Sequence, residues 1–220
     1  MSEQVDPNDF IITRKRKKFK FAHFANYPNC FEMDEFRIVI DEKRPITVEI
    51  GAGTGLFSVE LAKRNPGNIY VATDVKADRL QAGAKQALAD GVTNVVFVRV
   101  HAESLPKIFQ PDTVASIWLT FSDPFPKKRH IKHRLTSGAF LSMYTNMLKN
   151  DGQLYIKHDN KQFFEWSLEQ LVAYNWYITE LTFDLHESDL ADDYKILTTY
   201  EQRWLNEGGV IGFVAAKRGD

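Results

Sequence analysis

The stretch ITVEIGAGTG, residues 46–55, decides the fold of this 220-residue chain. Its first half, residues 46–50, is short and apolar, which is typical of a buried strand. Glycines at alternate positions follow, and they let the backbone turn tightly and approach a ligand closely. The stretch therefore predicts a buried strand that ends in a glycine-rich turn.

Strands and helices alternate along the chain on both sides of this turn. Further strands are predicted at 69–73, 95–100, 114–121 and 154–158, helices at 55–65, 76–90, 136–149 and 160–174, and a closing antiparallel hairpin at 177–183 and 210–216. This order indicates an α/β, Rossmann-like fold with a mostly parallel, seven-stranded sheet and helices on both faces. Ligands of such sheets bind beyond the carboxyl ends of the strands, so the residues after each strand are the candidates for a site.

The composition is that of a globular protein. Apolar residues make up 44% of the chain and charged residues 26%, which excludes wholesale disorder and coiled coils. No apolar run is long enough to span a membrane, and the first ten residues lack the features of a secretory signal, so we expect a cytoplasmic protein. The single Cys30 excludes an internal disulfide and a Cys-rich metal site, and no metal is expected.

Two short segments carry much of the positive charge. Residues 14–20 hold six Lys or Arg side chains, residues 127–134 hold five, and neither segment contains an acid. The whole chain has 28 basic and 29 acidic residues, so the rest of it is acidic. A solvated face explains one such run, but two runs on an acidic body indicate a polyanionic partner. The candidate contacts in the first segment are Arg14, Lys15, Arg16, Lys17 and Lys18.

The N-terminal part differs from the rest of the sequence. Residues 1–13 lack periodicity and predict a loose tail, and residues 14–30 mix bases with aromatic residues. We therefore expect residues 1–30 to form a basic, aromatic arm that is partly flexible, and residues 31–220 to form a single domain.

The glycine turn favours one kind of nucleoside ligand. A dinucleotide fingerprint needs a glycine where this chain has Leu56, so that pattern fails. The G-x-G-x-G form after Glu49 resembles the first motif of class I S-adenosylmethionine-dependent methyltransferases, with Gly51 and Gly53 at the ligand. A carboxylate such as Glu49 favours the cationic groups of that ligand. A tight turn without a ligand is the alternative.

Polar residues follow the next two strands as well. Asp74 can accept hydrogen bonds from the two hydroxyls of a ribose, or it can cap the following helix. After the third strand, His101 or Glu103 can meet the adenine, and His101 can equally be a histidine without a ligand. These residues support a nucleoside cofactor without choosing one.

The segment FSDPFPKKRH, residues 121–130, is the most specific stretch of the chain. Asp123 leaves the carboxyl end of a buried strand, and two prolines bracket Phe125 and stiffen the loop. A dense run of cations follows at once. A structural loop does not need so many cations, so this segment predicts a carboxylate beside an anchor for phosphates.

These motifs together resemble those of the bacterial tRNA (guanine-N7)-methyltransferases. The resemblance runs from about residue 14 to the C-terminus and rests on RKRKKFKFAHFANYPNCFE, EIGAGTG, SDPFPKKRHIKHRLT, IKHDN and LTTYE. It implies the class I methyltransferase fold, S-adenosylmethionine as cofactor and tRNA as partner, with Asp123 as the catalytic residue. By resemblance, the cofactor site is Glu49, Gly51, Gly53, Asp74, His101 and Asp123; the substrate site is Lys127, Asp159, Thr198, Thr199, Tyr200 and Glu201; and Arg129, His130, Lys132, His133 and Arg134 contact RNA.

The chain departs from the family pattern at four positions. Phe125 stands where the family usually has Trp, and His101 where it commonly has an acid or an amide. Thr199 replaces a glutamate, and Asp74 is one methylene shorter than the usual glutamate. These departures bear on the contacts with adenine, ribose and substrate.

The expected activity is methyl transfer to N7 of a guanosine in tRNA, in the variable loop by family resemblance. An amino-group methyltransferase acting on adenine or cytosine is the nearest alternative, but its motif has the order Asp-Pro-Pro-aromatic. A non-catalytic RNA-binding module with a decayed cofactor site is a second alternative. A small-molecule methyltransferase would leave the cations after Pro126 unexplained. The sequence leaves open whether the protein is a monomer or a homodimer.

Overall fold

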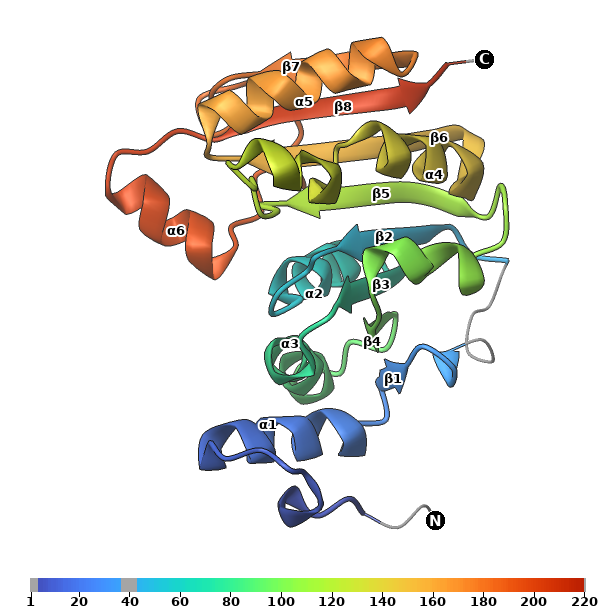
Figure 1. Ribbon diagram of the computed structural model, residues 1–220, viewed down its shortest axis with the longest axis vertical. Helices are drawn as coiled ribbons and strands as arrows, with labels where there is room; N and C mark the ends of the chain where they lie inside the picture. The colour runs from blue at the N-terminus through green and yellow to red at the C-terminus, as the bar shows by residue number, and fades with distance from the viewer. Residues whose placement is uncertain (1–3, 37–42, 220) are drawn as a thin grey trace. The chain divides into compact units, whose positions relative to one another are not determined.

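The computed structural model describes residues 4–36 and 43–219, and the chain divides into two compact units at residue 108. Each unit contains four strands among the described residues. The two units are described in turn, in the colours of Figure 1, which run from blue at the N-terminus to red at the C-terminus.

The first unit is a parallel sheet with the strand order β1-β4-β3-β2. Its strands are β1 (Cys30–Glu32), β2 (Ile46–Ile50), β3 (Ile69–Asp74) and β4 (Val95–Arg99), and its α-helices are α1 (Lys15–Asn26), α2 (Leu56–Arg64) and α3 (Ala77–Ala89). A 3-10 helix, η3 (Ala102–Lys107), follows β4. Val48, Val71 and Phe97 are fully buried, so the strands form the core as their apolar runs predict.

Helix α3 packs directly on the glycine turn. The backbone N–H of Gly83 donates to the Thr54 carbonyl at 2.9 Å, and a Cβ at Gly83 would lie 2.4 Å from that oxygen. Only glycine permits this approach, because a side chain would force the helix away from the turn. Gly83 therefore fixes the distance between α3 and the candidate ligand turn.

The N-terminal arm forms a helix. Helix α1 buries Ala22 and Phe24 and packs against α3, whereas most of its basic residues are exposed and Lys18 is half-buried. Residues 4–13, expected as a loose tail, contain a 3-10 turn, η1 (Pro7–Asp9), and Val5 exchanges two backbone hydrogen bonds with the Asn26 amide. The proposed boundary between an arm and a single domain at residue 31 stays a prediction.

The second unit is a mixed sheet with the strand order β5-β6-β8-β7. Its strands are β5 (Val114–Thr120), β6 (Leu148–His158), β7 (Trp176–Thr182) and β8 (Gly212–Arg218), and its helices are η4 (Lys128–His133), α4 (Gly138–Met147), α5 (Lys161–Ala173) and α6 (Thr199–Asn206). Strands β5 and β6 are parallel, and β8 runs antiparallel to both β6 and β7. The predicted antiparallel pair at the C-terminus is confirmed, although α6 separates its two strands in sequence.

Helices and aromatic side chains pack on the second sheet. Helices α4 and α5 lie on one face (Figure 1). An aromatic cluster packs on these strands: the Trp118 and Tyr155 rings lie 4.5 Å apart, and Tyr194 stacks on Phe213 at 4.5 Å. Tyr194 comes from the long connection before α6, so this connection is tied to the sheet through apolar contact.

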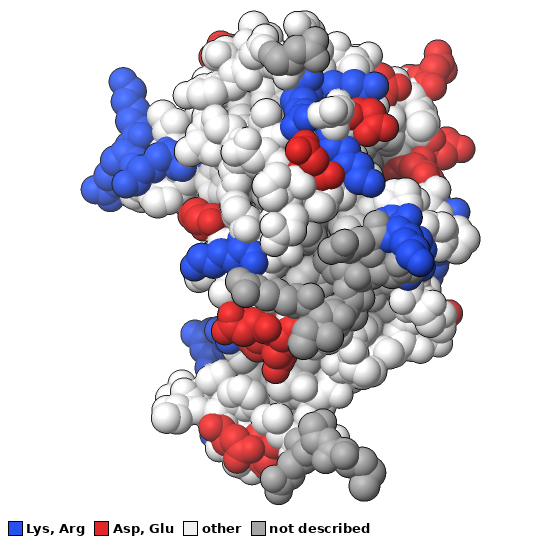
Figure 2. All heavy atoms as spheres, turned by 90° about the vertical axis from the view of Figure 1, so that its right-hand side faces the viewer, with Lys and Arg blue, Asp and Glu red and all other residues white. Residues whose placement is uncertain are grey.

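The predicted fold class is confirmed, with one strand more than expected. Strand β1 pairs with β4 and brings the described strands to eight instead of seven. Three residues are too few to show a periodic pattern, which is why the sequence did not predict it. On the face that Figure 2 shows, acidic and basic side chains are mixed in small groups.

Candidate active site

The glycine turn after β2 is held open by its backbone conformation. Gly51, Gly53 and Gly55 have φ values of 75°, 58° and 70°, a region that other residues rarely adopt. The N–H groups of Gly51 and Ala52 both donate to the Thr73 carbonyl at 2.9 Å. These bonds tie the turn to the end of β3.

Two of these glycines serve different purposes. A Cβ at Gly55 would lie 2.6 Å from the Phe97 ring, so Gly55 is required by the core. A Cβ at Gly53 would meet nothing within 4 Å. The backbone at Gly53 therefore faces open space, which a ligand can approach without displacing protein atoms.

Asp74 stands beside this open space at the end of β3. One carboxylate oxygen accepts the Gly53 N–H at 2.8 Å, and the other accepts the Lys76 N–H at 2.8 Å. A carboxylate offers about four acceptor positions, so two remain for a pair of ribose hydroxyls. Asp74 thus shapes the turn and the start of α3 and still has acceptor capacity for a ligand.

Glu49 lies one residue before the end of β2 and is 2% exposed. The Ser58 hydroxyl of α2 donates to its carboxylate at 2.6 Å, the short distance of a charge-assisted bond. The carboxylate is therefore fixed in orientation next to the glycine turn. A fixed negative charge there favours a cationic ligand group.

His101 follows β4 and is the N-cap residue of η3. Its side chain forms no capping hydrogen bond, and both His101 and Glu103 are exposed. Both side chains can therefore reach a ligand at the carboxyl edge of the sheet. Whether either one meets adenine stays a prediction.

The polar groups at the glycine turn of the first unit fit S-adenosylmethionine. It combines an open backbone at Gly53, free acceptor positions on Asp74 and a fixed carboxylate at Glu49. A nucleoside needs the open backbone and the acceptor positions of Asp74. The cationic sulfonium and ammonium groups are favoured by the carboxylate of Glu49.

The loop after β5 is strained. Phe121 and Phe125 have φ values of 52° and 39°, although neither is a glycine. Such residues cost of order 1–3 kcal/mol each and persist only where neighbouring groups hold them. Asp123 lies between them with an exposed side chain. The strain is therefore concentrated around the predicted catalytic carboxylate.

His158 joins the ends of β5 and β6. Its Nδ1 accepts the Asn160 backbone N–H at 2.9 Å, so Nε2 carries the proton and donates to the Ser122 carbonyl at 2.8 Å. Burial lowers the pKa of His158, which favours this neutral form. A neutral ring thus holds the residue next to Asp123.

Asp159, which follows β6, lies next to Tyr200 of α6. The Tyr200 hydroxyl donates to the Asp159 carboxylate at 2.7 Å, and this bond raises the pKa of Tyr200 to about 12. The Tyr200 ring lies 5.3 Å from that of Phe121. Asp159 also lines a cavity of about 300 Å³ together with Phe164, Glu165 and Phe183. Carboxylates beside aromatic rings suit a flat base that carries hydrogen-bond donors.

Glu201 takes part in a buried ion pair between α6 and β6. Its side chain and that of Lys157 are both 0% exposed, and their charged atoms lie 2.8 Å apart. His186 contacts the same carboxylate at 2.9 Å, and Thr198 and Glu201 form a reciprocal cap at the start of α6. The ion pair therefore anchors α6 to β6, and the predicted contact of Glu201 with guanosine stays a prediction. The Thr199 side chain lies outside the described part of the chain.

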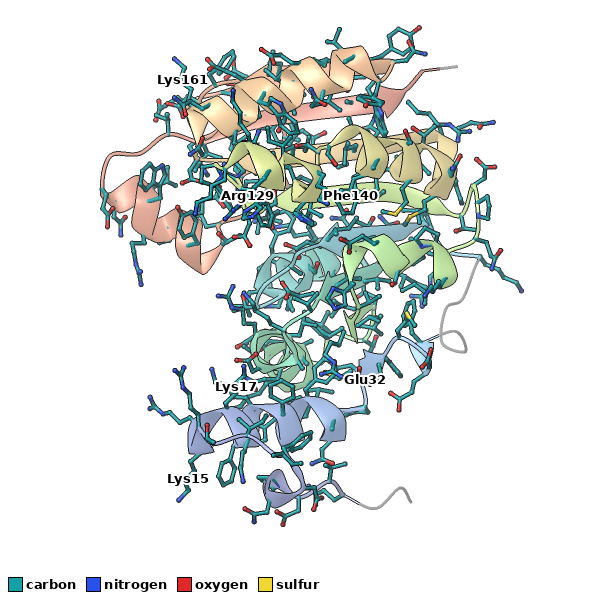
Figure 3. The ribbon with its side chains drawn as sticks, viewed as in Figure 1. Lys15, Lys17, Glu32, Arg129, Phe140 and Lys161 are labelled. Carbon is teal, nitrogen blue, oxygen red and sulfur yellow. The ribbon has the colours of Figure 1, made fainter. Side chains whose placement is uncertain are left out.

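The second basic segment exposes most of its cations. Figure 3 labels Arg129 in this segment and Lys15 and Lys17 on α1. The exposed members are Lys127, Lys128, Arg129, Lys132 and His133, with His130 half-buried. The Phe125 ring lies 5.9 Å from His133 and 6.4 Å from His130, so aromatic surface accompanies the charge.

Arg134 differs from its neighbours. It is half-buried and donates to the carbonyls of Pro124 and Phe125 at 2.8 and 3.2 Å. Its guanidinium carbon lies 4.4 Å from the centre of the Trp166 ring. The expected RNA contact therefore falls on a side chain that the structure uses to hold the Asp123 loop.

Comparison with known proteins gives the family of this chain. A family profile described as "Putative methyltransferase" matches residues 43–213. A tRNA (guanine-N(7)-)-methyltransferase of Brevibacillus brevis is 40% identical over 90% of this chain and 91% of its own length. One from Lachnoclostridium phytofermentans is 40% identical over 98% of this chain and 94% of its own. The chain belongs to the tRNA (guanine-N7)-methyltransferase family.

Solved structures support the methyltransferase fold of this family member. The 16S rRNA methyltransferase KamB superimposes with a TM-score of 0.64 at 16% identity, over 86% of this chain and 95% of KamB. A 16S rRNA (adenine(1408)-N(1))-methyltransferase from Catenulisporales acidiphilia has a TM-score of 0.56 at 14% identity, over 98% of this chain and 92% of its own.

Sequence reasoning missed several residues that shape the methyltransferase site. Ser58, His158 and Lys157 hold Glu49, the Ser122 carbonyl and Glu201, respectively. His158 and Lys157 lie in the IKHDN motif, so their presence there was the one available signal. Among residues 4–36 and 43–219, no group of three or more His, Cys, Asp or Glu side chains could hold a metal ion. No helix in these ranges is long and apolar enough to cross a membrane.

Proposed function

We infer that this methyltransferase transfers a methyl group from S-adenosylmethionine to N7 of a guanosine in tRNA. The observation that carries this conclusion is the 40% identity, over 98% of the chain, to a protein named for that reaction. The match covers both the glycine turn and the Asp123 loop.

When bound, S-adenosylmethionine supplies a methyl group on a cationic sulfonium. We assign its binding to Glu49, Gly51, Gly53, Asp74 and His101. The free acceptor positions of Asp74 suit the ribose hydroxyls, and the fixed carboxylate of Glu49 suits the positive charge. His101 is exposed and can lie along the adenine. The family resemblance adds Asp123 to this set.

The reaction needs no general base for the transfer itself. Guanine N7 carries a lone pair and no proton, so it can accept the methyl group directly. Positive charge then appears on the purine, and the protein must orient the base and stabilise that charge. The exposed carboxylate of Asp123 is suited to both tasks, since it can accept hydrogen bonds from guanine N–H groups.

We assign the rest of the guanosine site to Lys127, Asp159, Thr198, Thr199, Tyr200 and Glu201. The bond between Tyr200 and Asp159 supports a shared role for these two, because it fixes the carboxylate beside an aromatic ring. Lys127 is exposed at the start of η4, where its charge can meet a phosphate. The buried position of Glu201 supports an indirect role through α6.

The basic residues of α1 and the exposed basic residues of segment 127–134 are proposed to bind the tRNA backbone. Their exposed cations supply affinity without sequence preference, so specificity must come from the shape of the tRNA and from the base pocket. The target base must be unpaired or turned out of its stack to reach the site. A tRNA substrate supports a cytoplasmic location for the enzyme, which is part of this proposal.

The experiment that tests this function follows the methyl group to its atom. The protein is incubated with unmodified tRNA and methyl-labelled S-adenosylmethionine, and the RNA is digested to nucleosides. We expect the label in 7-methylguanosine. Label in methyladenosine or methylcytosine would favour an amino-group methyltransferase. Binding of tRNA without S-adenosylmethionine binding, measured by calorimetry, would favour an RNA-binding module.

A further inference from the structure

The loop that carries Asp123 needs support from outside itself. Phe125 has a φ of 39°, which is costly for a bulky side chain. The flanking residues Pro124 and Pro126 have no N–H to donate, so the loop cannot hold itself through its own backbone hydrogen bonds there. The conformation therefore depends on donors supplied by another segment.

Arg134 supplies those donors. Its Nε donates to the Pro124 carbonyl at 2.8 Å, and one terminal nitrogen donates to the Phe125 carbonyl at 3.2 Å. The planar guanidinium fork matches two consecutive carbonyls, and hydrogen bonds from a charged donor are the stronger kind. Both acceptors belong to the residues that immediately follow Asp123.

Helix α5 fixes the guanidinium in turn. The guanidinium carbon lies 4.4 Å from the centre of the Trp166 ring and 5.6 Å from that of Phe163. Phe163 is 2% exposed, so this surface belongs to the folded core. Arg134 therefore connects the loop to a rigid helix through cation–π contact on one side and hydrogen bonds on the other.

We propose that Arg134 is a positioning residue that holds the backbone of Pro124 and Phe125, and through it the Asp123 carboxylate, instead of an RNA phosphate contact. This proposal rests on the methyl transfer inferred above. Lysine at this position would keep the positive charge but lose the planar fork and the flat face that stacks on Trp166. The Arg134→Lys substitution therefore separates the two roles.

The test compares Arg134→Lys with Lys132→Ala, which removes an exposed cation of the same segment. For Arg134→Lys we expect the single-turnover rate at saturating tRNA to fall about 10- to 100-fold. Its tRNA Kd should stay within about twofold of the wild type, because the charge is kept. Lys132→Ala should instead raise the tRNA Kd. Thermal unfolding confirms that each variant is folded.

Two further readouts complete the test, and the first of them is independent of tRNA binding. Hydrogen exchange of the peptide spanning residues 121–128 should be faster in Arg134→Lys, because the loop has lost its clamp. Trp166→Phe, which keeps an aromatic face, should retain more activity than Trp166→Leu. A wild-type rate and unchanged exchange in Arg134→Lys would overturn the proposal. If the wild type made no 7-methylguanosine, the proposed function would fail, and the exchange measurement would still decide the role of Arg134.

Discussion

Asp123 is the residue whose loss should affect the chemistry most. In the proposed mechanism its carboxylate orients the base and stabilises the charge that appears on it, and alanine removes that carboxylate. We expect single-turnover methyl transfer by Asp123→Ala to fall about 10²- to 10³-fold, as when one electrostatic group is removed from an active site. The Kd for S-adenosylmethionine, measured by calorimetry, should change much less.

Asp123→Asn serves as the matched control, because it keeps the size and one acceptor oxygen. Its rate should lie between those of the wild type and Asp123→Ala. Near-normal single-turnover methylation by Asp123→Ala would remove this residue from the mechanism.

Alanine substitutions at Gly53 and Gly55 should differ in their effect on stability. Alanine at either position has an unfavourable left-handed φ, which costs about 1–2 kcal/mol. At Gly55 the new methyl group also meets the Phe97 ring at 2.6 Å, which adds about 1–3 kcal/mol. Denaturant unfolding should therefore show the larger loss for Gly55→Ala.

The affinity for S-adenosylmethionine should rank the same two variants in the opposite order, with the larger loss for Gly53→Ala. The methyl group of Gly53→Ala enters the open space assigned to the cofactor, so S-adenosylmethionine affinity should fall more than tenfold while the protein stays folded. If Gly53→Ala bound S-adenosylmethionine as tightly as the wild type, the assignment of this turn would be wrong.

His158 connects the end of β5 to the end of β6, and its titration makes the stability of the fold depend on pH. Burial holds its pKa below the ordinary value of about 6.5, so near and below that value the unfolded chain binds a proton that the folded one does not. The contribution to stability is present above about pH 6.5 and is lost as the pH falls through the folded pKa. The loss amounts to at most about 1.4 kcal/mol per pH unit for one proton.

Denaturant unfolding between pH 7.5 and 5 measures this effect. The free energy of unfolding of His158→Gln, which keeps a donor for the Ser122 carbonyl, should fall less steeply with decreasing pH than that of the wild type. Equal slopes for the two proteins would show that His158 is not the titrating group.

The elements that could be predicted are those with a clear periodic pattern. The strands that include ITVEI and VVFVRV and the helices α3 and α5 lie where the sequence placed them, because their burial follows from local apolar spacing. Helix α6 was missed because its eight residues contain no fully apolar face and depend on the cap formed by Thr198 and Glu201. Strand β1 depends on its pairing with β4, which the sequence does not show.

The same limit applies to the site. Residues that follow strands, such as Asp74 and Asp123, could be proposed because ligands of such sheets bind beyond the carboxyl ends of the strands, and their roles stay predictions. The contact between Arg134 and the loop could not be predicted from the sequence. Within a basic run one cation looks like the next, and only the structure shows that Arg134 packs on the Trp166 ring. The burial of Glu201 was hidden for the same reason, because Lys157 lies 44 residues away in sequence.

For the whole molecule, charge should govern the affinity for tRNA. If about six of the cations on α1 and in segment 127–134 neutralise phosphates, the logarithm of the binding constant should fall with the logarithm of salt concentration with a slope of about −4. Filter binding or fluorescence anisotropy across a salt series measures this slope. Replacing Lys15, Arg16 and Lys17 together should reduce its magnitude by about two.

A slope near zero would exclude a role for these segments in binding. An unchanged slope in the triple variant would restrict the contact to segment 127–134. The reduction should be the same for every tRNA sequence tested, because phosphate contacts carry no sequence information.

The central claim is that the lone pair of guanine N7 receives the methyl group, and a single atom tests it. A tRNA is assembled with 7-deazaguanosine at the methylated position, so that carbon replaces N7 and the other edges of the base are kept, and labelled methyl transfer is measured in a single turnover. The account predicts that this tRNA binds as tightly as its guanosine counterpart and takes up no label. Label incorporated at the normal rate would contradict it.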